Sequence, residues 1–298
     1  MHKRTFVALT LAALVSGCAS LAQTERVPAE LLSVFEWRAG DRPAGGISAI
    51  EVDDDGLGFL AVTDAATLIE GSFVRTDGQV TAVNVTRAMR LKAGSDRAVT
   101  REEEDSEGLA IAPDGTVWVS FEGRAPRVWS YPDLTRPAVV PPQLRAFRQL
   151  QLNSALEALA IDSEGVVYTL PERSGALDRP FPVYRFTGED WDQQLSVPRR
   201  GDFLPVGADF GPDGKFYLLE RRFRGIFGFA TRVRRFDVTA AELVNEERVF
   251  ETRSGVHDNL EGLSVWEDQN GDLRLTMVSD DNNFPLQRTE IVEYRILQ

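Results

Sequence analysis

The sequence has 298 residues, of which 43% are hydrophobic and 27% are charged, and this is enough apolar material for one large folded core. Its 46 acidic residues outnumber its 33 lysines and arginines, which gives a formal net charge of −13. A chain this acidic is not expected to bind the phosphate backbone of a nucleic acid. A single cysteine, Cys18, excludes disulfide bonds within the chain.

The N-terminus has the features of a secretory signal. A charged start, residues 1–4, precedes an apolar stretch, residues 5–15, that is too short to span a bilayer as a helix. Small residues then lead to Cys18, as in the lipobox of bacterial lipoproteins. We therefore predict a signal peptide over residues 1–17, a lipid anchor on Cys18 with a linker over residues 18–28, and one domain over residues 29–298. Ala19 favours the outer membrane, with the domain facing the periplasm.

A short motif recurs five times along the rest of the chain. Each copy has an apolar strand, a turn that contains glycine, and a second apolar strand, which together predict a β-hairpin. The copies cover residues 46–64, 106–122, 156–172, 206–221 and 260–281, with turn glycines Gly56, Gly115, Gly165, Gly214 and Gly271. Successive glycines are 59, 50, 49 and 57 residues apart, a spacing typical of the blades of a β-propeller.

Between the copies there is room for two further strands. The predicted pairs are residues 67–75 with 80–91, 127–131 with 144–150, 182–186 with 191–197, and 231–238 with 247–252. One strand, residues 290–297, follows the last copy, and one unclaimed strand, residues 31–37, lies near the N-terminus. Pairing these two closes a ring, so we predict an all-β propeller of five four-stranded antiparallel blades. A six-bladed ring, with one blade that lacks the motif, is the alternative.

Glutamates recur where the first strand of the motif begins. Glu107, Glu157 and Glu261 hold this place in three copies, and Ser48 and Val206 hold it in the other two. Because the innermost strand of each blade lines the channel, we expect the three glutamates to meet at one mouth of that channel. Carboxylates this close repel one another unless a cation neutralises them. We predict that they bind a divalent cation, calcium first and magnesium second, since all the ligands are oxygens.

A second set of acids ends the second strands and returns to the same mouth: Asp64, Glu122, Glu172, Glu220 and Asp280. Arginines follow several of them and provide charge for an anionic substrate. The predicted catalytic residues are Asp280, Glu220 and Arg221, with either acid accepting a proton. The predicted substrate-binding residues are Arg173, Arg222 and Asn282. The alternative is that each acid accepts backbone hydrogen bonds from a neighbouring blade and has no chemical role.

Three further features bear on the site. His257 is the one histidine after the signal region, and we interpret it as a surface-loop residue. The acids beside the turn glycines, such as Asp114 and Asp213, serve hairpin geometry at the opposite face. Residues 220–229 are basic and aromatic, which favours either a loop that contacts an anionic or amphiphilic ligand or one that packs over the blade edge.

Six short segments of these motifs occur in a fixed order: residues 45–48 with 62–64, 105–108, 156–159, 218–221, 259–262 and 279–284. In this order they resemble the phytase-like family, described as "esterase-like activity of phytase", over residues 43–297. The resemblance implies a secreted propeller whose recurrent glutamates and aspartates form an active site for phosphoester or ester hydrolysis. Ser48 departs from the pattern, which weakens the claim of that copy to a ligand.

Our first hypothesis is a metal-assisted hydrolase of small anionic esters, phosphoesters above all, acting as a lipid-anchored monomer in the cell envelope. Two alternatives stay open. A lactonase-like propeller would share the metal but act on a neutral sugar lactone. A non-catalytic envelope protein would use the metal and the ring of glutamates to stiffen a binding platform for a glycan or a protein.

Overall fold

Each recurring motif forms the hairpin that the sequence predicts. The inner strands, in chain order, are β3 (Ile47–Val52) and β4 (Gly58–Thr63), β7 (Ser106–Ile111) and β8 (Val117–Phe121), β10 (Leu156–Ile161) and β11 (Val167–Pro171), β14 (Leu204–Phe210) and β15 (Phe216–Phe223), and β18 (Leu260–Glu267) and β19 (Leu273–Ser279). The turn glycines adopt positive φ, for example 84° at Gly115. Asp114 Oδ1 accepts a hydrogen bond from the backbone N–H of Thr116 at 2.9 Å, so this acid serves the turn.

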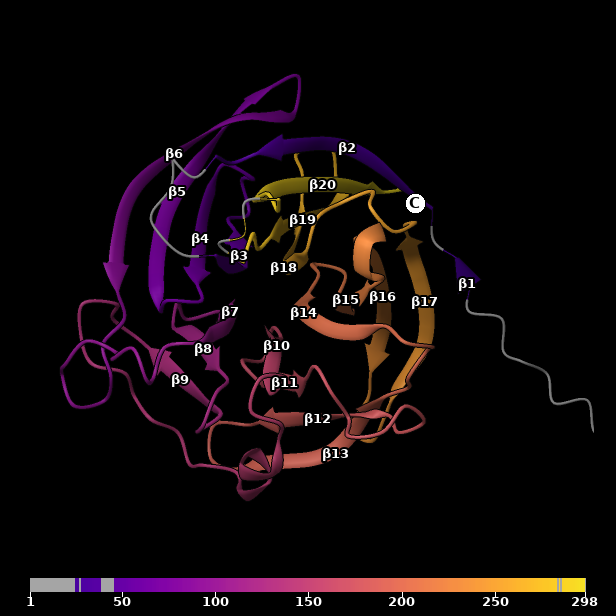
Figure 1. Cartoon of the computed structure of the whole chain (residues 1–298). Coiled ribbons are helices and arrows are strands. Elements are labelled where there is room, and N and C mark those ends of the chain that lie inside the picture. The colour runs from indigo at the N-terminus through magenta and orange to yellow at the C-terminus, as the bar shows by residue number, and fades with distance from the viewer. Residues whose placement is uncertain (1–24, 27, 39–45, 283, 285, 298) are drawn as a thin grey trace, which may run out of the picture.

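The five hairpins are the inner halves of five sheets arranged as a ring around a central axis (Figure 1). The computed structural model describes residues 25–26, 28–38, 46–282, 284 and 286–297. It confirms the all-β propeller with five blades and excludes the six-bladed alternative. The predicted signal peptide and lipid anchor on Cys18 lie outside the described residues. Among the helices of those residues, none has the length and apolar character needed to cross a membrane.

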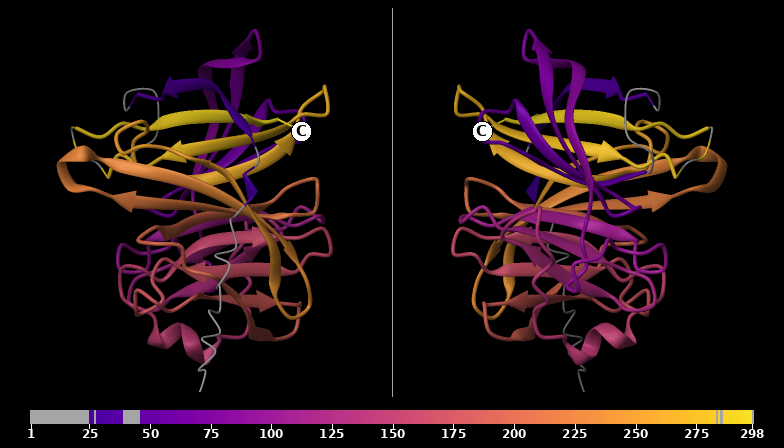
Figure 2. Two further views of the ribbon diagram at one scale, coloured as in Figure 1. Left: turned by 90° about the vertical axis from the view of Figure 1, so that its right-hand side faces the viewer. Right: turned by 90° about the vertical axis from the view of Figure 1, so that its left-hand side faces the viewer.

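The outer strands complete the blades. They are β5 (Thr67–Thr76) and β6 (Gln79–Arg90), β9 (Arg127–Tyr131), β12 (Phe181–Phe186) and β13 (Trp191–Val197), and β16 (Phe229–Val238) and β17 (Leu243–Glu251). In the side views the loops between strands gather on the two opposite faces of the ring (Figure 2). Blade numbers below follow the order of the inner hairpins, so that β7 belongs to blade 2 and β15 to blade 4.

The prediction of a strand over residues 144–150 is wrong. This segment forms the short 3₁₀ helix η2 (Arg145–Gln149), and its buried Phe147 packs edge-on against Tyr184 and Trp191 at 5.2 and 5.1 Å. The segment follows Pro141 and Pro142, which have no N–H to donate to a sheet. Blade 2 therefore has three strands, and one isolated bridge between Ser130 and Val139 stands where a fourth would lie.

The two ends of the chain close the ring, as predicted. β20 (Glu290–Ile296) pairs antiparallel with β2 (Ala29–Glu36) and completes blade 5. A two-residue strand, β1 (Glu25–Arg26), adds parallel to the outer edge of β17, which the sequence does not predict. Arg75 of blade 1 donates two hydrogen bonds of 2.7 Å to the fully buried Glu293 of blade 5. This bidentate pair joins the first and last blades.

Apolar side chains fill the space between every pair of neighbouring blades. In the described residues they form five clusters, one for each interface, and the cluster between blades 5 and 1 shows that the ring is closed. The innermost strands contact one another in the order β3, β7, β10, β14, β18 and back to β3. They therefore surround a narrow axis, and one end of that axis carries the acids of the motif.

Candidate active site

A β-bulge interrupts each inner hairpin at the same place. The pairing of the innermost strand shifts just after the strand begins, and the residues left out of the pairing include Ser48, Glu107, Glu157, Val206 and Glu261. In blade 2 the pairing also leaves out Gly108. A bulge re-aims the side chain of the extra residue. Glu107, Glu157 and Glu261 consequently line one cavity on the axis, although they are up to 154 residues apart in sequence.

Small residues after the bulges let the strands approach closely. A Cβ atom on Gly207 would lie 2.3 Å from the carbonyl oxygen of Glu261, and one on Gly262 would lie 2.9 Å from Cα of Ala49. The cavity that the strands leave has a volume of only about 10 Å³, room for no more than a water molecule or a bare ion. Any organic substrate must therefore stay at the mouth.

The second strands end in charged residues at this mouth. The last paired residues of β8, β11 and β19 are Phe121, Pro171 and Ser279, and the next residues are Glu122, Glu172 and Asp280. In blade 4 the same register places Arg221, not Glu220, at this position, because Pro205 pairs with Glu220. Glu122 and Glu172 each lie seven residues after their turn glycines, and the same count from Gly214 gives Arg221, so this signal was present in the sequence.

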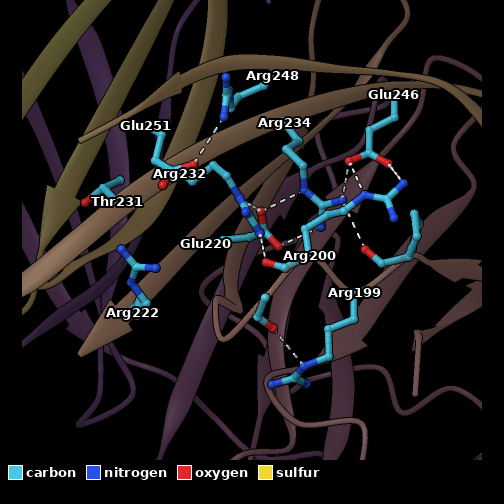
Figure 3. A network of polar contacts seen from close by, with 12 residues as sticks. Arg199, Arg200, Glu220, Arg222, Thr231, Arg232, Arg234, Glu246, Arg248 and Glu251 are labelled. Carbon is cyan, nitrogen blue, oxygen red and sulfur yellow. Dashed lines mark hydrogen bonds and ion pairs between the residues drawn. The ribbon is translucent and has the colours of Figure 1, made fainter. Parts of the chain in front are cut away.

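Glu220 belongs to a different network, which contradicts its predicted place in the cluster. It is fully buried, and its carboxylate accepts hydrogen bonds from Arg232 at 2.7 Å and from Arg234 at 2.6 and 2.8 Å (Figure 3). Although burial opposes its charge, these two arginines lower the pKa of Glu220. Arg234 also donates to Glu246 at 2.8 Å. A carboxylate held by two arginines has a structural role and is not free to accept a proton.

Arg221 occupies one half of the mouth. It donates to Asn259 Oδ1 at 2.5 Å, to Glu261 Oε1, and to Glu172 Oε1 at 3.3 Å. Asn259 in turn donates to Glu261 at 2.7 Å and so fixes both charged groups. Burial opposes the charge of Arg221, but Glu261, Glu157 and Glu172 raise its pKa. This half therefore contains its own counter-ion.

In the other half of the mouth the described residues form no such ion pair, and the charge of Arg127 offsets the raised pKa of Asp105 only in part. Asp105, Glu107 and Glu122 each place a carboxylate oxygen within 4.8 Å of the others. Throughout the described chain, no ion pair joins these three acids to a lysine or an arginine. Burial raises the pKa of Glu107 well above its usual value, and the charges of Glu157 and Glu122 raise it further. Burial likewise raises the pKa of Glu122 to about 7, and it raises the pKa of Asp105.

These residues fit a hard divalent cation. Their ligand atoms are all oxygens, and the nearby Oδ1 of Asp64 and Oγ of Ser48 are buried without a hydrogen-bond partner. The set differs from the predicted one, because Asp105 and Glu122 join Glu107, whereas Glu261 pairs with Arg221. Glu157 lies between the two halves, with a side-chain hydrogen bond to Glu122. No acid repeats at the position of Asp105 in the other copies of the motif. The φ of 94° at Asp105 is unusual for a residue with a side chain, and such strain is often found at functional sites.

Asp280 lies at the mouth between the two halves. It is buried, its side chain covers Gly46, and its Oδ1 accepts the backbone N–H of Asn282 at 2.8 Å. Burial, with added repulsion from Glu261 and Asp64, raises the pKa of Asp280 to about 8. The side chain of Asn282 itself donates to Gln287 at 3.3 Å.

The two other predicted arginines lie in different places. Arg173 is half-exposed at the mouth and lies 3.4 Å from Glu172 Oε2. Arg222 turns away from the mouth, since it is the neighbour of Arg221 in a strand, and it pairs with Asp202 at 3.1 Å and stacks over Phe203. The structure therefore brings Arg173 to the acids and does not bring Arg222.

His257 is buried, so its interpretation as a surface residue is wrong. Its Nε2 lies 2.7 Å from the hydroxyl of Tyr294, and burial lowers its pKa to about 4. It packs edge-on against Tyr294 of β20. The groups at the mouth whose pKa values are raised toward neutrality are carboxyl groups, such as Glu122 and Asp280.

Comparisons with known proteins agree with this architecture. The model of the phytase-like family, described as esterase-like activity of phytase, matches residues 42–283. No curated protein sequence matches the chain. Among solved structures, an α-L-arabinofuranosidase from Podospora anserina in complex with cellotriose shares 12% identity over 91% of this chain and 97% of its own, with a TM-score of 0.52. This likeness concerns the fold alone.

Two further solved propellers are less similar in shape. A calcium-binding protein, regucalcin, from Agrobacterium tumefaciens shares 10% identity over 92% of this chain and 98% of its own, with a TM-score of 0.49. A gluconolactonase from Xanthomonas campestris shares 15% identity over 81% of this chain and 69% of its own, with a TM-score of 0.44.

Proposed function

Since the chain belongs to the phytase-like family, we propose that it is a metal-assisted hydrolase of a small anionic ester, phosphoesters above all, that acts at the acidic mouth. One observation carries the proposal: three carboxylate oxygens without a basic partner lie within 4.8 Å of one another, beside a second group of acids that Arg221 neutralises. A cation and an arginine side by side suit an anionic substrate.

Asp105, Glu107 and Glu122 would hold the cation. Calcium is the first choice because the donors are all oxygens and come from a bulge and two strand ends, which give irregular geometry that calcium tolerates better than magnesium. Such a cation, when bound, supplies Lewis-acid activation of the ester and of the attacking water. Binding also removes the repulsion that raises the pKa of Glu107 and Glu122.

Arg221 and Arg173 would bind the anionic group. Asn259, Glu261 and Glu172 fix the guanidinium of Arg221 before any substrate arrives, so its charge is preorganised for the charge that develops in the transition state. Arg173 is half-exposed and can reach a substrate from the solvent side. Arg222 and Glu220 have no role in this proposal.

Asp280 would transfer the proton. Because Oδ1 accepts the N–H of Asn282, Oδ2 is the oxygen that carries the proton. With a pKa of about 8 this carboxyl group is protonated in most molecules at pH 7, so it can donate to the departing alcohol. Its role is therefore that of an acid, whereas the sequence suggested a base.

The lipid anchor remains a proposal of its own. A lipid on Cys18 would hold a monomeric propeller at the periplasmic side of the outer membrane. Labelling of the full-length protein with radioactive palmitate tests it: we expect incorporation in the unmodified protein and none in the Cys18→Ala variant. Equal labelling, or none in either protein, would contradict it.

Hydrolysis assays separate the candidate functions. The purified domain is incubated with p-nitrophenyl phosphate, p-nitrophenyl acetate, phytate and a sugar lactone, with EDTA and after calcium is restored. We expect calcium-dependent turnover of an anionic ester. Turnover of the lactone alone would favour a lactonase-like propeller. No turnover, with calcium still raising the melting temperature, would favour the binding platform.

A further inference from the structure

The hairpin that carries Arg221 continues beyond the mouth as an aromatic loop. The loop joins β15 to β16 through the short helix η3 (Gly225–Phe227). Its apolar side chains are unusually exposed, with Phe223 64%, Ile226 95% and Phe227 70% accessible to solvent. The sequence allowed these residues to pack over the blade edge, and the structure shows that they do not. Exposed apolar groups of this size call for an explanation.

The rings of Phe223 and Phe229 lie on the same side of the hairpin as Arg221. Alternate residues of a strand share a face, and Phe223 pairs directly with Phe229 across the two strands. Their ring centroids are 4.9 Å apart. The guanidinium carbon of Arg221 lies 5.9 Å from the centroid of Phe229. A continuous path therefore leads from the charged mouth across Phe229 to Phe223.

The loop has a defined conformation. The N–H of Arg224 donates to the carbonyl of Gly228 at 2.9 Å, and Gly228 adopts a φ of 73° that favours glycine. The N–H of Gly255, in the next loop, donates to the carbonyl of Phe229 at 2.8 Å. These bonds hold the rings in place, so a ligand would not have to order the loop before binding.

We propose that Phe223 and Phe229, together with the exposed Phe227 of the same loop, form an apolar subsite that binds the acyl or aryl part of the anionic ester whose charged group lies at Arg221. The inference rests on the proposed function and specifies its substrate as an amphiphile. Charge and shape agree with this occupant: the channel excludes organic groups, so an ester held at the mouth must extend over the surface, and the apolar surface in contact with Arg221 is this hairpin.

Binding of alkylphosphonates tests the subsite without requiring catalysis. Ethyl-, butyl- and octylphosphonate are titrated into the calcium-loaded protein below their micellar concentrations, and the heat is measured. We expect the affinity to rise about two- to threefold per methylene that contacts the loop, somewhat less than for full burial because the loop is open to solvent. In the Phe223→Ser/Phe227→Ser double variant, ethylphosphonate should bind as before and the dependence on chain length should disappear.

Leu177→Ser is the matched control, because Leu177 is 80% exposed and lies in the loop between β11 and β12 of blade 3, outside the β15–β16 hairpin. It should keep the dependence on chain length. Equal binding of all three phosphonates, or an unchanged dependence in the double variant, would overturn the subsite and leave the proposed function standing. Failure of every phosphonate to bind would overturn the proposed function as well. Loop-dependent binding to phosphatidylcholine vesicles, without any dependence on phosphonate chain length, would assign the loop to a membrane and overturn the subsite.

Discussion

Glu220 and Glu122 are both buried glutamates near the ends of second strands, yet their surroundings shift their pKa values in opposite directions. Two arginines hold Glu220 in its ionised form, and its pKa is lowered. Glu122 lies among other acids, and its pKa is raised to about 7. The comparison shows that burial of an acid does not by itself mark a functional residue. Glu220 already has its counter-ions and stabilises the fold, whereas Glu122 belongs to the cluster for which we propose a cation.

The largest expected effect is the loss of stability on substitution of Glu220, the acid that two arginines hold. Glu220→Gln would leave Arg232 and Arg234 buried with their main partner neutralised, so we expect the free energy of unfolding to fall by about 3–5 kcal/mol. Urea denaturation measures the change, and it should be the same with EDTA and with calcium. Glu103→Gln is the control, since its pair with Arg97 is exposed and should contribute less than about 1 kcal/mol. A loss no larger than the control's would contradict the structural role of Glu220.

Arg221 is the positive charge that neutralises Glu261 and Glu172 in one half of the mouth. Arg221→Met should lower kcat by about 100- to 1,000-fold, the range typical of losing a preorganised group that stabilises the transition state. Arg173→Met should lower kcat less than about tenfold, because Arg173 is half-exposed and its charge is screened by solvent. Steady-state kinetics with the best substrate measures both losses of kcat. Equal losses in the two variants would show that Arg221 does not stabilise the transition state more than Arg173 does.

In the cluster of Asp105, Glu107 and Glu122, loss of an acid should not reduce the stability of the metal-free protein. Glu107→Gln removes repulsion, so the metal-free protein should be unchanged or more stable by about 1 kcal/mol. Its affinity for calcium should fall at least tenfold, because the number of charged ligands sets calcium affinity. Thermal unfolding with EDTA and with calcium measures both effects. Destabilisation of the metal-free variant by several kcal/mol would mean that Glu107 is a structural acid like Glu220.

The stability of the metal-free protein should depend on pH through the acids at the mouth. Glu122 and Asp280 have raised pKa values in the folded protein, about 7 and about 8, so the folded state binds protons more tightly than the unfolded one. The metal-free protein should therefore gain about 1–2 kcal/mol as the pH falls from 8 to 6.5. Below pH 6.5 His257 opposes this gain, because its lowered pKa favours protonation of the unfolded chain. Urea denaturation across pH 5–8 measures the curve. With calcium bound, the part of the gain that comes from the ligand Glu122 should vanish and the part from Asp280 should remain, so a curve that calcium does not change would contradict the proposal.

The repeat in the sequence was sufficient to predict the propeller. The turn glycines and the alternating apolar residues specify five hairpins, and the two unclaimed terminal strands specify closure. The failure at residues 144–150 has a local cause, since prolines before the segment remove donors and Phe147 packs as part of a 3₁₀ helix. The sequence also placed Glu107, Glu157 and Glu261 around one cavity correctly, because a bulge repeats in every blade.

The details of the site were harder to predict. In blade 4 the prediction was wrong by one residue, because Arg221 and not Glu220 reaches the mouth. In a strand, one residue is enough to move a side chain to the opposite face. Asp105 lies two residues before Glu107, but Ala155 and Asn259 hold the equivalent places, so no repeated acid reveals it. The burial of His257 depends on its contact with Tyr294, which is 37 residues away in sequence. Each of these depends on tertiary contacts that periodicity does not encode.

Calorimetric titration of the metal-free protein with calcium at pH 7.5 shows whether the acids at the mouth bind a cation. We expect saturable binding at one site that is strongly weakened in Glu107→Gln and unchanged in Asp114→Asn, a turn acid on the opposite face. Absence of binding, or equal binding by the unmodified protein and Glu107→Gln, would contradict the proposed cation site.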